Sequence, residues 1–339
     1  MSNKLFNLDV PIIQAPMAGG VTTPELVAAV SNAGALGSLG AGYMTPDELR
    51  HAIKKIKSLT KKPFNVNLFI PEKSKSNDNP SSMKELLATL WSEMSNTPFE
   101  GAVPSTPSFE EQVSVILEEK VPIFSFTFGI PSSSLIERFK NLETLIYGTA
   151  TTPEEAQKLE EAGVDAIVCQ GQEAGGHRGN FSSYDPFYSL APLLTLAQEK
   201  VKTPLIAAGG IMNGKSAAAT FLLGAHAAQL GTAFLTTTES GASSTYKEAL
   251  LKKPYLPTSI TQAFTGKPAR AIINSLMEKL NNHPILSYPA QHFLTQKLRN
   301  LAAQKKRSDL MSLWAGQSYP LCRSIDAASL VHQIAKELE

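Results

Sequence analysis

The ten residues from 170 to 179, Gln-Gly-Gln-Glu-Ala-Gly-Gly-His-Arg-Gly, combine residue types that bind ligands and carry out chemistry. Glycines at this density let the backbone approach a flat or anionic ligand, and His177 can change its charge near neutral pH. The segment follows an apolar run, 165–169, that is typical of a buried strand. A glycine-rich surface turn with a solvated histidine is the alternative. A position directly after a buried strand favours a functional site.

Short apolar runs recur along the chain, and a helical pattern follows each of them. Such nearly continuous apolar runs are typical of parallel strands that helices cover. Eight runs fit this description: 11–15, 36–40, 64–70, 123–128, 144–148, 166–170, 205–209 and 227–234. Strand followed by helix, eight times, predicts an α/β fold, the TIM (β/α)8 barrel. A doubly wound sheet would need a Gly-x-Gly-x-x-Gly turn after an early strand, which residues 15–20 do not supply.

Start signals support the helices of this repeat. Thr45-Pro-Asp-Glu48 and Thr152-Pro-Glu-Glu155 each offer a threonine N-cap, a proline at the first helical position and a glutamate three residues after the cap. Both are expected to be complete capping boxes.

Two long stretches interrupt the repeat, one after the third strand and one after the eighth. Because both leave from carboxyl ends of strands, we expect them to form a small helical second domain that caps the catalytic face. The expected barrel comprises 1–71, 108–235 and 325–339, and the expected cap comprises 72–107 and 236–324.

Composition narrows the classes of function. The chain has 339 residues, 42% hydrophobic and 18% charged, with a formal net charge of +1. This balance gives no strong field for nucleic acid or an anionic membrane and favours a small-molecule partner. No apolar stretch reaches the ~18 residues of a membrane span. Cys169 and Cys322 lack metal-like spacing, so no metal site is expected and a cytoplasmic location fits.

Two glycine-containing segments follow the seventh and eighth predicted strands. Gly209 and Gly210 end the run Leu-Ile-Ala-Ala-Gly-Gly, and Gly231 and Thr232 lie in Gln-Leu-Gly-Thr-Ala. These positions in a barrel commonly bind a phosphate through backbone N–H groups. Tight turns without a ligand are the alternative, but two such segments on adjacent strands favour a phosphate-bearing ligand.

Polar groups of the early strands complete the expected cleft. Met17 and Ala18 leave the first strand, and Asn67 lies on the third. An amide-rich, mostly uncharged cleft with a phosphate clamp suits flavin mononucleotide, whose ring edge would pair with amides such as Asn67 and Gln170. Asn67 as a strand-end turn residue and Gln170 as a polar residue of the barrel interior are the alternatives.

Together these segments resemble bacterial class I nitronate monooxygenase, of the 2-nitropropane dioxygenase family, and the similarity runs nearly end to end. The matching stretches are 11–19 (Pro-Ile-Ile-Gln-Ala-Pro-Met-Ala-Gly), 67–71 (Asn-Leu-Phe-Ile-Pro), 170–177, 207–211 (Ala-Ala-Gly-Gly-Ile), 229–234 (Gln-Leu-Gly-Thr-Ala-Phe) and 314–317 (Trp-Ala-Gly-Gln). Each string is weak alone. Their order, their spacing and the final Trp-Ala-Gly-Gln are specific for the class.

The resemblance implies site residues. His177 is expected to be the catalytic histidine. With the glycine segments included, the expected FMN-binding residues are Met17, Ala18, Asn67, Gln170, Gly175, Gly176, Gly209, Gly210, Gln229, Leu230, Gly231 and Thr232.

The substrate side is less defined. Thr127 stands where some relatives carry a histidine, and Tyr288 either faces the substrate or packs within the cap. Arg178 could hold a substrate carboxylate, although a solvent-facing side chain is the expectation.

The implied reaction is oxidative denitrification of an alkyl nitronate, propionate 3-nitronate being the expected substrate, with O2 as acceptor and a flavin semiquinone on the path. His177 would orient the nitronate, either protonated or as a hydrogen-bonding group, or would abstract an α-proton from a neutral nitroalkane. An FMN-dependent NAD(P)H reductase of the same superfamily, either an enoyl-acyl-carrier-protein reductase or a quinone reductase, is the alternative, and a non-catalytic FMN sensor is a third. A homodimer is an open expectation.

Overall fold

A closed barrel of eight parallel strands forms the body of the protein. The computed structural model describes residues 8–71, 81–101 and 106–338. The barrel strands are β1 (Ile12–Gln14), β2 (Gly37–Gly40), β3 (Phe64–Phe69), β4 (Ile123–Thr127), β5 (Leu145–Ala150), β6 (Ala166–Gln170), β8 (Leu205–Ala208) and β9 (Ala227–Leu230). They hydrogen-bond in the order β1-β9-β8-β6-β5-β4-β3-β2, and a parallel bridge between Ile13 and Leu36 joins the two ends. The predicted TIM barrel is confirmed.

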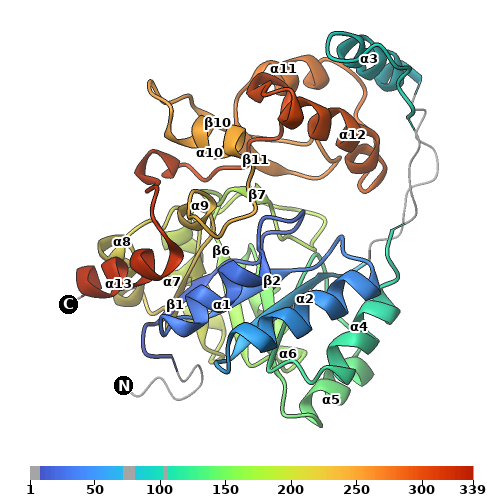
Figure 1. Cartoon of the computed structure of the whole chain (residues 1–339). Coiled ribbons are helices and arrows are strands. Elements are labelled where there is room, and N and C mark those ends of the chain that lie inside the picture. Colours follow the sequence, from blue (N-terminus) through green and yellow to red (C-terminus); the bar gives the residue numbers. More distant parts are fainter. Residues whose placement is uncertain (1–7, 72–80, 102–105, 339) are drawn as a thin grey trace.

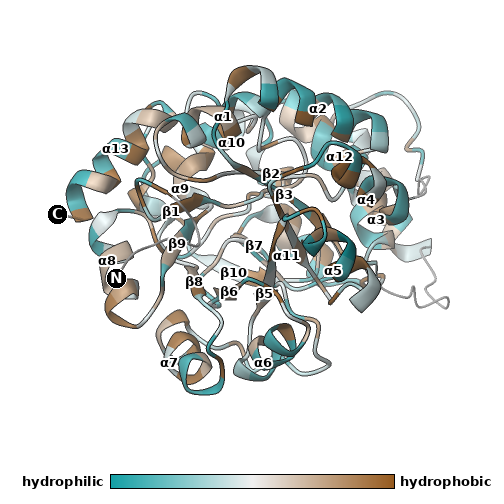
Figure 2. Ribbon diagram, turned by 90° about the horizontal axis from the view of Figure 1, so that it is seen from below, coloured by the Kyte–Doolittle hydropathy of each residue, from teal (hydrophilic) through white to brown (hydrophobic). Residues whose placement is uncertain are grey.

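Helices surround this barrel, one after each strand (Figure 2). They are α1 (Pro24–Asn32), α2 (Pro46–Leu59), α4 (Phe109–Glu118), α5 (Ser133–Lys140), α6 (Pro153–Glu161), α7 (Leu190–Lys200), α8 (Gly214–Leu222) and α13 (Ala327–Leu338). Their apolar faces pack on the outward side chains of the strands in one large buried cluster. Because both faces of each strand are buried, the strands read as continuous apolar runs in the sequence.

The remaining elements lie above the carboxyl ends of the strands (Figure 1). They are β7 (Gly176–His177), β10 (Thr258–Thr261), β11 (Ala269–Ile272), α3 (Ser81–Ser92), α9 (Thr232–Leu235), α10 (Ser244–Leu251), α11 (Ser275–Asn281), α12 (Ala290–Gln304) and the short 3-10 helices 308–310 and 319–321. Most share a second buried apolar cluster, which includes Leu87 and Leu298. The exact division of the chain into two domains stays a prediction, and residues 72–80 and 102–105 of the expected cap lie outside the described part.

The cap contains a small sheet in addition to its helices. A three-stranded antiparallel sheet, in the order β10-β11-β7, lies at its base. Its third strand is the Gly176–His177 pair, and His177 is in register with Ala269. The glycine-rich loop therefore contributes a strand to the cap, which fixes the backbone of the histidine.

The eighth strand is shorter than predicted. It ends at Leu230, and Gly231 turns the backbone (φ −104°, ψ −70°) into α9 at Thr232. The run Thr-Ala-Phe-Leu is largely buried, which is why it resembles a continued strand in the sequence.

Of the two predicted capping boxes, one is complete. Glu48 closes the box at Thr45. Thr152 caps α6, but the Glu155 carboxylate accepts hydrogen bonds from the N–H groups of Thr151, Phe181 and Ser182 instead. Buried Glu155 thus anchors the segment that follows the His177 loop.

None of the helices in the described ranges is long and apolar enough to cross a membrane.

Candidate active site

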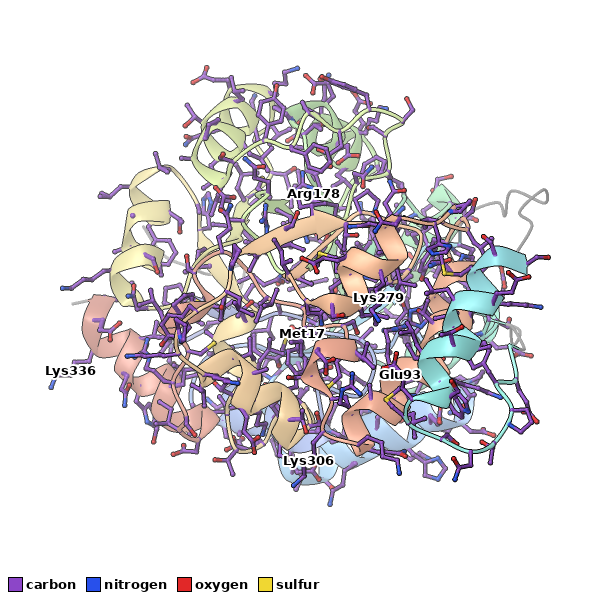
Figure 3. All side chains as sticks on the ribbon, turned by 90° about the horizontal axis from the view of Figure 1, so that it is seen from above. Met17, Glu93, Arg178, Lys279, Lys306 and Lys336 are labelled. Carbon is purple, nitrogen blue, oxygen red and sulfur yellow. The ribbon has the colours of Figure 1, made fainter. Side chains whose placement is uncertain are left out.

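A cavity of about 460 Å³ lies between the mouth of the barrel and the cap. Met17, one of its lining residues, lies near the centre of the view down onto the cap (Figure 3). The predicted site residues that line it are Met17, Ala18, Asn67, Thr127, Gln170, Gly175, Gly176, His177, Gly209, Gly210, Gln229, Gly231 and Thr232. Two predicted residues do not line it: the Leu230 side chain is buried in the barrel core, and Tyr288 contacts the His177 ring from outside the lining. The roles of all these residues stay predictions.

The two glycine segments after β8 and β9 present unused backbone donors. Gly209 and Gly210 have φ angles of +120° and +72°, which L side chains rarely adopt. Within the described residues, the N–H groups of Gly209, Gly210 and Thr232 donate no hydrogen bond to the protein. Backbone amides gathered in this way form a concave anion site.

The N-terminus of α8 is bonded to the protein's own side chains and does not add donors to this group of backbone amides. The N–H of Gly214 donates to the Glu337 carboxylate over 2.7 Å, and Asn213 caps the helix by bonding to Ser216. Arg323 also binds Glu337 and the carbonyl of Met212. The last helix of the chain therefore holds the glycine segment in place but occupies the helix end itself.

The Trp-Ala-Gly-Gln segment, residues 314–317, connects the cap with the segment after β9 and with the glycine-rich loop after β6. The N–H of Gly316 donates to the Thr232 hydroxyl (3.0 Å), and the N–H of Gln317 donates to the Glu173 carbonyl (3.0 Å). A Cβ on Gly175 would lie 2.5 Å from the backbone nitrogen of Gly316. The close passage of these two backbones explains why glycine is needed at 175.

Gln170 and Arg178 position the histidine loop from within. The Gln170 amide donates to the His177 carbonyl (3.0 Å) and accepts from the Gly179 N–H (2.8 Å). Arg178 is 1% exposed and forms a two-pronged ion pair with Asp185. The expectation of a solvent-facing Arg178 is therefore wrong. Its charge is already paired, so it serves the loop and not a substrate carboxylate.

Aromatic rings enclose His177, and its side chain also has a polar contact. The rings of Phe128, Tyr288 and Trp314 lie 5.8, 6.0 and 5.5 Å from its own, centre to centre. Its Nε2 lies 2.9 Å from the Thr265 hydroxyl. Burial, with further contributions from the charges of Lys267 and Arg299, lowers the pKa of His177 to about 3. The imidazole is therefore neutral at physiological pH.

The contact with Thr265 bears on the tautomer of this neutral ring. The Thr265 hydroxyl also lies 3.2 Å from the Lys267 carbonyl, to which it can donate its single proton. In that arrangement Nε2–H of His177 donates to the threonine oxygen, and Nδ1 keeps its lone pair. Nδ1 is then the atom that can accept a proton or a hydrogen bond.

The amide of Asn67 and the hydroxyl of Thr127 lie side by side at the mouth. Asn67 Nδ2 donates to the Ser125 hydroxyl at 2.9 Å and is 3.4 Å from the Thr127 hydroxyl. Tyr288 contacts the His177 ring, and its hydroxyl is 3.4 Å from that of Tyr43. Thr127 therefore lines the cavity beside Asn67, whereas Tyr288 lies outside the lining and contacts the histidine ring instead.

Sequence reasoning missed the polar face of α12. His292, Gln296, Arg299, Asn300 and Ala303 line the cavity at helical spacing. The signal that could have found them is a cluster of polar residues repeating every three to four positions in an amphipathic helix, since a core-facing helix rarely buries arginine or histidine. Ser318, beside Gly210, is a second missed lining residue.

Comparisons with known proteins agree on one family. The family model described as nitronate monooxygenase matches residues 3–337. A probable nitronate monooxygenase of Staphylococcus saprophyticus is 41% identical and covers 98% of this chain and 96% of its own length. The solved nitroalkane oxidase from Streptomyces ansochromogenes is 41% identical, with a TM-score of 0.93 over 99% of this chain and 98% of its own. FabK from Thermotoga maritima is 30% identical (TM-score 0.79; 99% and 94% covered).

Proposed function

Because the chain belongs to the nitronate monooxygenase family, a flavin-dependent group of oxidoreductases, we propose that it uses FMN to denitrify alkyl nitronates oxidatively with O2. Propionate 3-nitronate is the proposed substrate. The observation that carries the proposal is a neutral, enclosed His177 in the same cavity as a set of free backbone donors.

The residues of the cavity fit FMN. Its volume lies within the range of sites for ligands of this size. The free N–H groups of Gly209, Gly210 and Thr232 are suited to a phosphate. A Cβ placed on Gly176 (φ +76°) would meet no other atom within 4 Å, so the backbone beside His177 stays open to a flat ring. The amides of Asn67 and Gln170 supply donors and acceptors for a heterocycle edge.

FMN, when bound, would supply the electron-accepting chemistry. The chain's own residues bind and orient the nitronate. When the Thr265 hydroxyl donates to Nε2, the Nδ1–H of neutral His177 can donate one hydrogen bond to a nitronate oxygen. In the other tautomer, with a bare Nδ1, a neutral nitroalkane would lose its α-proton to Nδ1. The orientation by a protonated His177, one of the two forms expected above, is disfavoured by a pKa of about 3. The rings of Phe128 and Trp314 exclude water around the imidazole.

An FMN-dependent NAD(P)H reductase is the second candidate, because the likeness to FabK extends over both barrel and cap. The stronger match to the nitroalkane oxidase favours the first candidate. A homodimer and a cytoplasmic location remain predictions.

The test is O2 uptake with nitrite release by the purified yellow protein. Propionate 3-nitronate should support both without a nicotinamide. Oxidation of NADH or NADPH with an enoyl or quinone acceptor, and no nitrite from nitronates, would transfer the protein to the second candidate.

A further inference from the structure

Arg299 is a buried arginine with no acidic partner among the described residues. The residue is 9% exposed, and it forms no ion pair with any residue in the described ranges. Its hydrogen bonds all go to neutral groups: Thr295 Oγ1 (3.1 Å), Ser312 Oγ (2.9 Å) and the His292 carbonyl (3.1 Å). Proteins rarely bury a guanidinium unless an anion compensates its charge.

These hydrogen bonds orient the guanidinium group but do not use all of its N–H donors. Nε and Nη2 are engaged by Thr295 and His292, with His292 Nδ1 a further 3.4 Å from Nη2. Nη1 carries two N–H groups, of which Ser312 accepts one. Burial lowers the pKa of Arg299 to about 10, so the group stays charged at neutral pH. His292 has a pKa lowered to about 2 by burial and by Arg299, and it adds no charge.

The other residues that line the cavity do not neutralise the charge of Arg299. Among the described lining residues there is no aspartate or glutamate, and Arg299 is the only one permanently charged. A cavity of this kind attracts anions. Neutral His177 cannot supply the positive charge that an anionic substrate needs.

Arg299 lies on the side of the cavity that faces β3, across the barrel from the glycine pair after β8. His292, which it contacts, stacks on Tyr43 after β2 with ring centres 4.3 Å apart, and Tyr43 contacts Phe69 of β3. In the closed strand order, β3 lies opposite β8, which carries the glycine pair. Arg299 is nevertheless close enough to His177 to affect its pKa. It therefore faces the substrate side of the cavity.

We propose that Arg299, held by Ser312, Thr295 and His292, binds the anionic oxygens of the substrate. The ligand chemistry is a planar oxyanion, O–N–O of a nitronate or O–C–O of a carboxylate, which the arginine fork matches. The inference rests on the proposed function for the identity of the substrate but not for the anion site itself. In this arrangement His177 takes the proton or forms the hydrogen bond, and Arg299 neutralises the negative charge of the substrate.

The first experiment needs no turnover. Propionate and its neutral isostere propionamide are titrated into the yellow holoenzyme, and binding is followed by the flavin absorbance and by calorimetry. Propionate should bind and propionamide should bind at least about tenfold more weakly, as expected for a charge-assisted contact. Equal affinities in the unaltered protein would overturn the proposal, whatever the variants do.

Variants assign the effect to Arg299. Arg299→Met should weaken propionate binding about ten- to a hundredfold while keeping its flavin. Arg307→Met is the matched control, because Arg307 lies in the cap but pairs with Asp309 on the surface. Unchanged propionate binding in Arg299→Met would refute the proposal, and loss of flavin from that variant would place Arg299 with the cofactor and refute it equally.

Kinetics then separate the two sources of the oxyanion. With Arg299→Met, a similar rise of KM for ethyl nitronate and propionate 3-nitronate would assign Arg299 to the nitronate group. A rise for propionate 3-nitronate that is at least about tenfold larger would assign it to the remote carboxylate. A KM unchanged for both would overturn the inference. If Arg299-dependent propionate binding holds but no nitronate is turned over, the anion site stands and the proposed function fails.

Discussion

The barrel and the cap line opposite sides of the cavity with different chemical groups. The barrel wall presents glycines, backbone N–H groups and amides, none of them charged, at the ends of β3, β6, β8 and β9. The cap wall presents mainly side chains, among them Tyr246, Trp314 and the polar face of α12 with the buried cation Arg299. Backbone donors suit a cofactor that stays, since they are rigid and already ordered by the fold. Side chains on a separate apolar cluster suit a ligand that varies, because they can change without disturbing the barrel.

The largest effect is expected from a substitution that disturbs only the barrel side of the cavity. In Gly210→Val a β-branched residue would have to adopt φ +72°, with its Cβ 3.3 Å from that of Glu173. We expect mostly colourless protein and complete loss of activity, measured as the ratio of flavin to protein absorbance.

Gly163→Val is the control for backbone strain. Gly163 has φ +81° at the end of α6, away from the cavity. It should lose stability and keep its flavin. Stoichiometric FMN in Gly210→Val would exclude the glycine pair from phosphate binding.

The second prediction concerns the residue at which the two walls meet. His177→Gln should retain flavin but lose nitronate kcat/KM by about a hundredfold or more, as loss of a proton-transferring or charge-stabilising group does. His226→Gln, at an exposed position before β9, is the matched control and should be neutral. Full turnover by His177→Gln would remove the histidine from the mechanism.

A smaller effect is expected from the residue that holds the imidazole. Thr265→Val removes the hydroxyl 2.9 Å from His177 Nε2, and we expect kcat to fall up to about tenfold, with a changed pH profile, because a single hydrogen bond is lost. Thr265→Ser, which keeps the hydroxyl, should restore both. A Thr265→Val enzyme with the original pH profile would show that the threonine only packs.

The last prediction concerns stability and not turnover. The ordinary pKa of histidine, 6.5, is lowered to about 3 in His177 and about 2 in His292. The unfolded chain therefore takes up both protons near pH 6.5 while the folded chain does not. The stability contributed by the neutral imidazoles is complete above pH 6.5 and is lost as the pH falls toward 3, by at most about 1.4 kcal/mol per pH unit for each histidine. Urea unfolding between pH 7 and 5 measures this slope, and His292→Gln should reduce it. An identical slope in that variant would contradict the lowered pKa of His292.

The barrel could be predicted from sequence because its determinants are local. Each strand is a short apolar run, and Thr45 with Glu48 closes the capping box of α2 as its spacing indicates. The glycines after the seventh and eighth strands could likewise be located from the sequence, because they directly follow the apolar runs. The local signals were misleading at 232–234, where a buried apolar run resembles a strand, and at Glu155, whose carboxylate bonds to the distant N–H of Phe181.

The cap wall could not be predicted in the same way because it depends on contacts across the sequence. β7 exists only because residues 176–177 pair with β11, about 90 positions later. Arg178 was expected in solvent because its partner, Asp185, is recognisable only once the loop is folded. The polar face of the helix that carries Arg299 can be recognised in the sequence. The cavity that this face lines depends on the tertiary structure.

The most direct test of the central claim is an anaerobic flavin spectrum. The yellow protein is mixed without O2 either with propionate 3-nitronate or with NADH or NADPH, and the flavin absorbance is followed. We predict that the nitronate alone reduces the flavin absorbance, and that His177→Gln slows this change strongly. Rapid bleaching by a nicotinamide, with no response to the nitronate, would contradict the account and identify a reductase built on the same two walls.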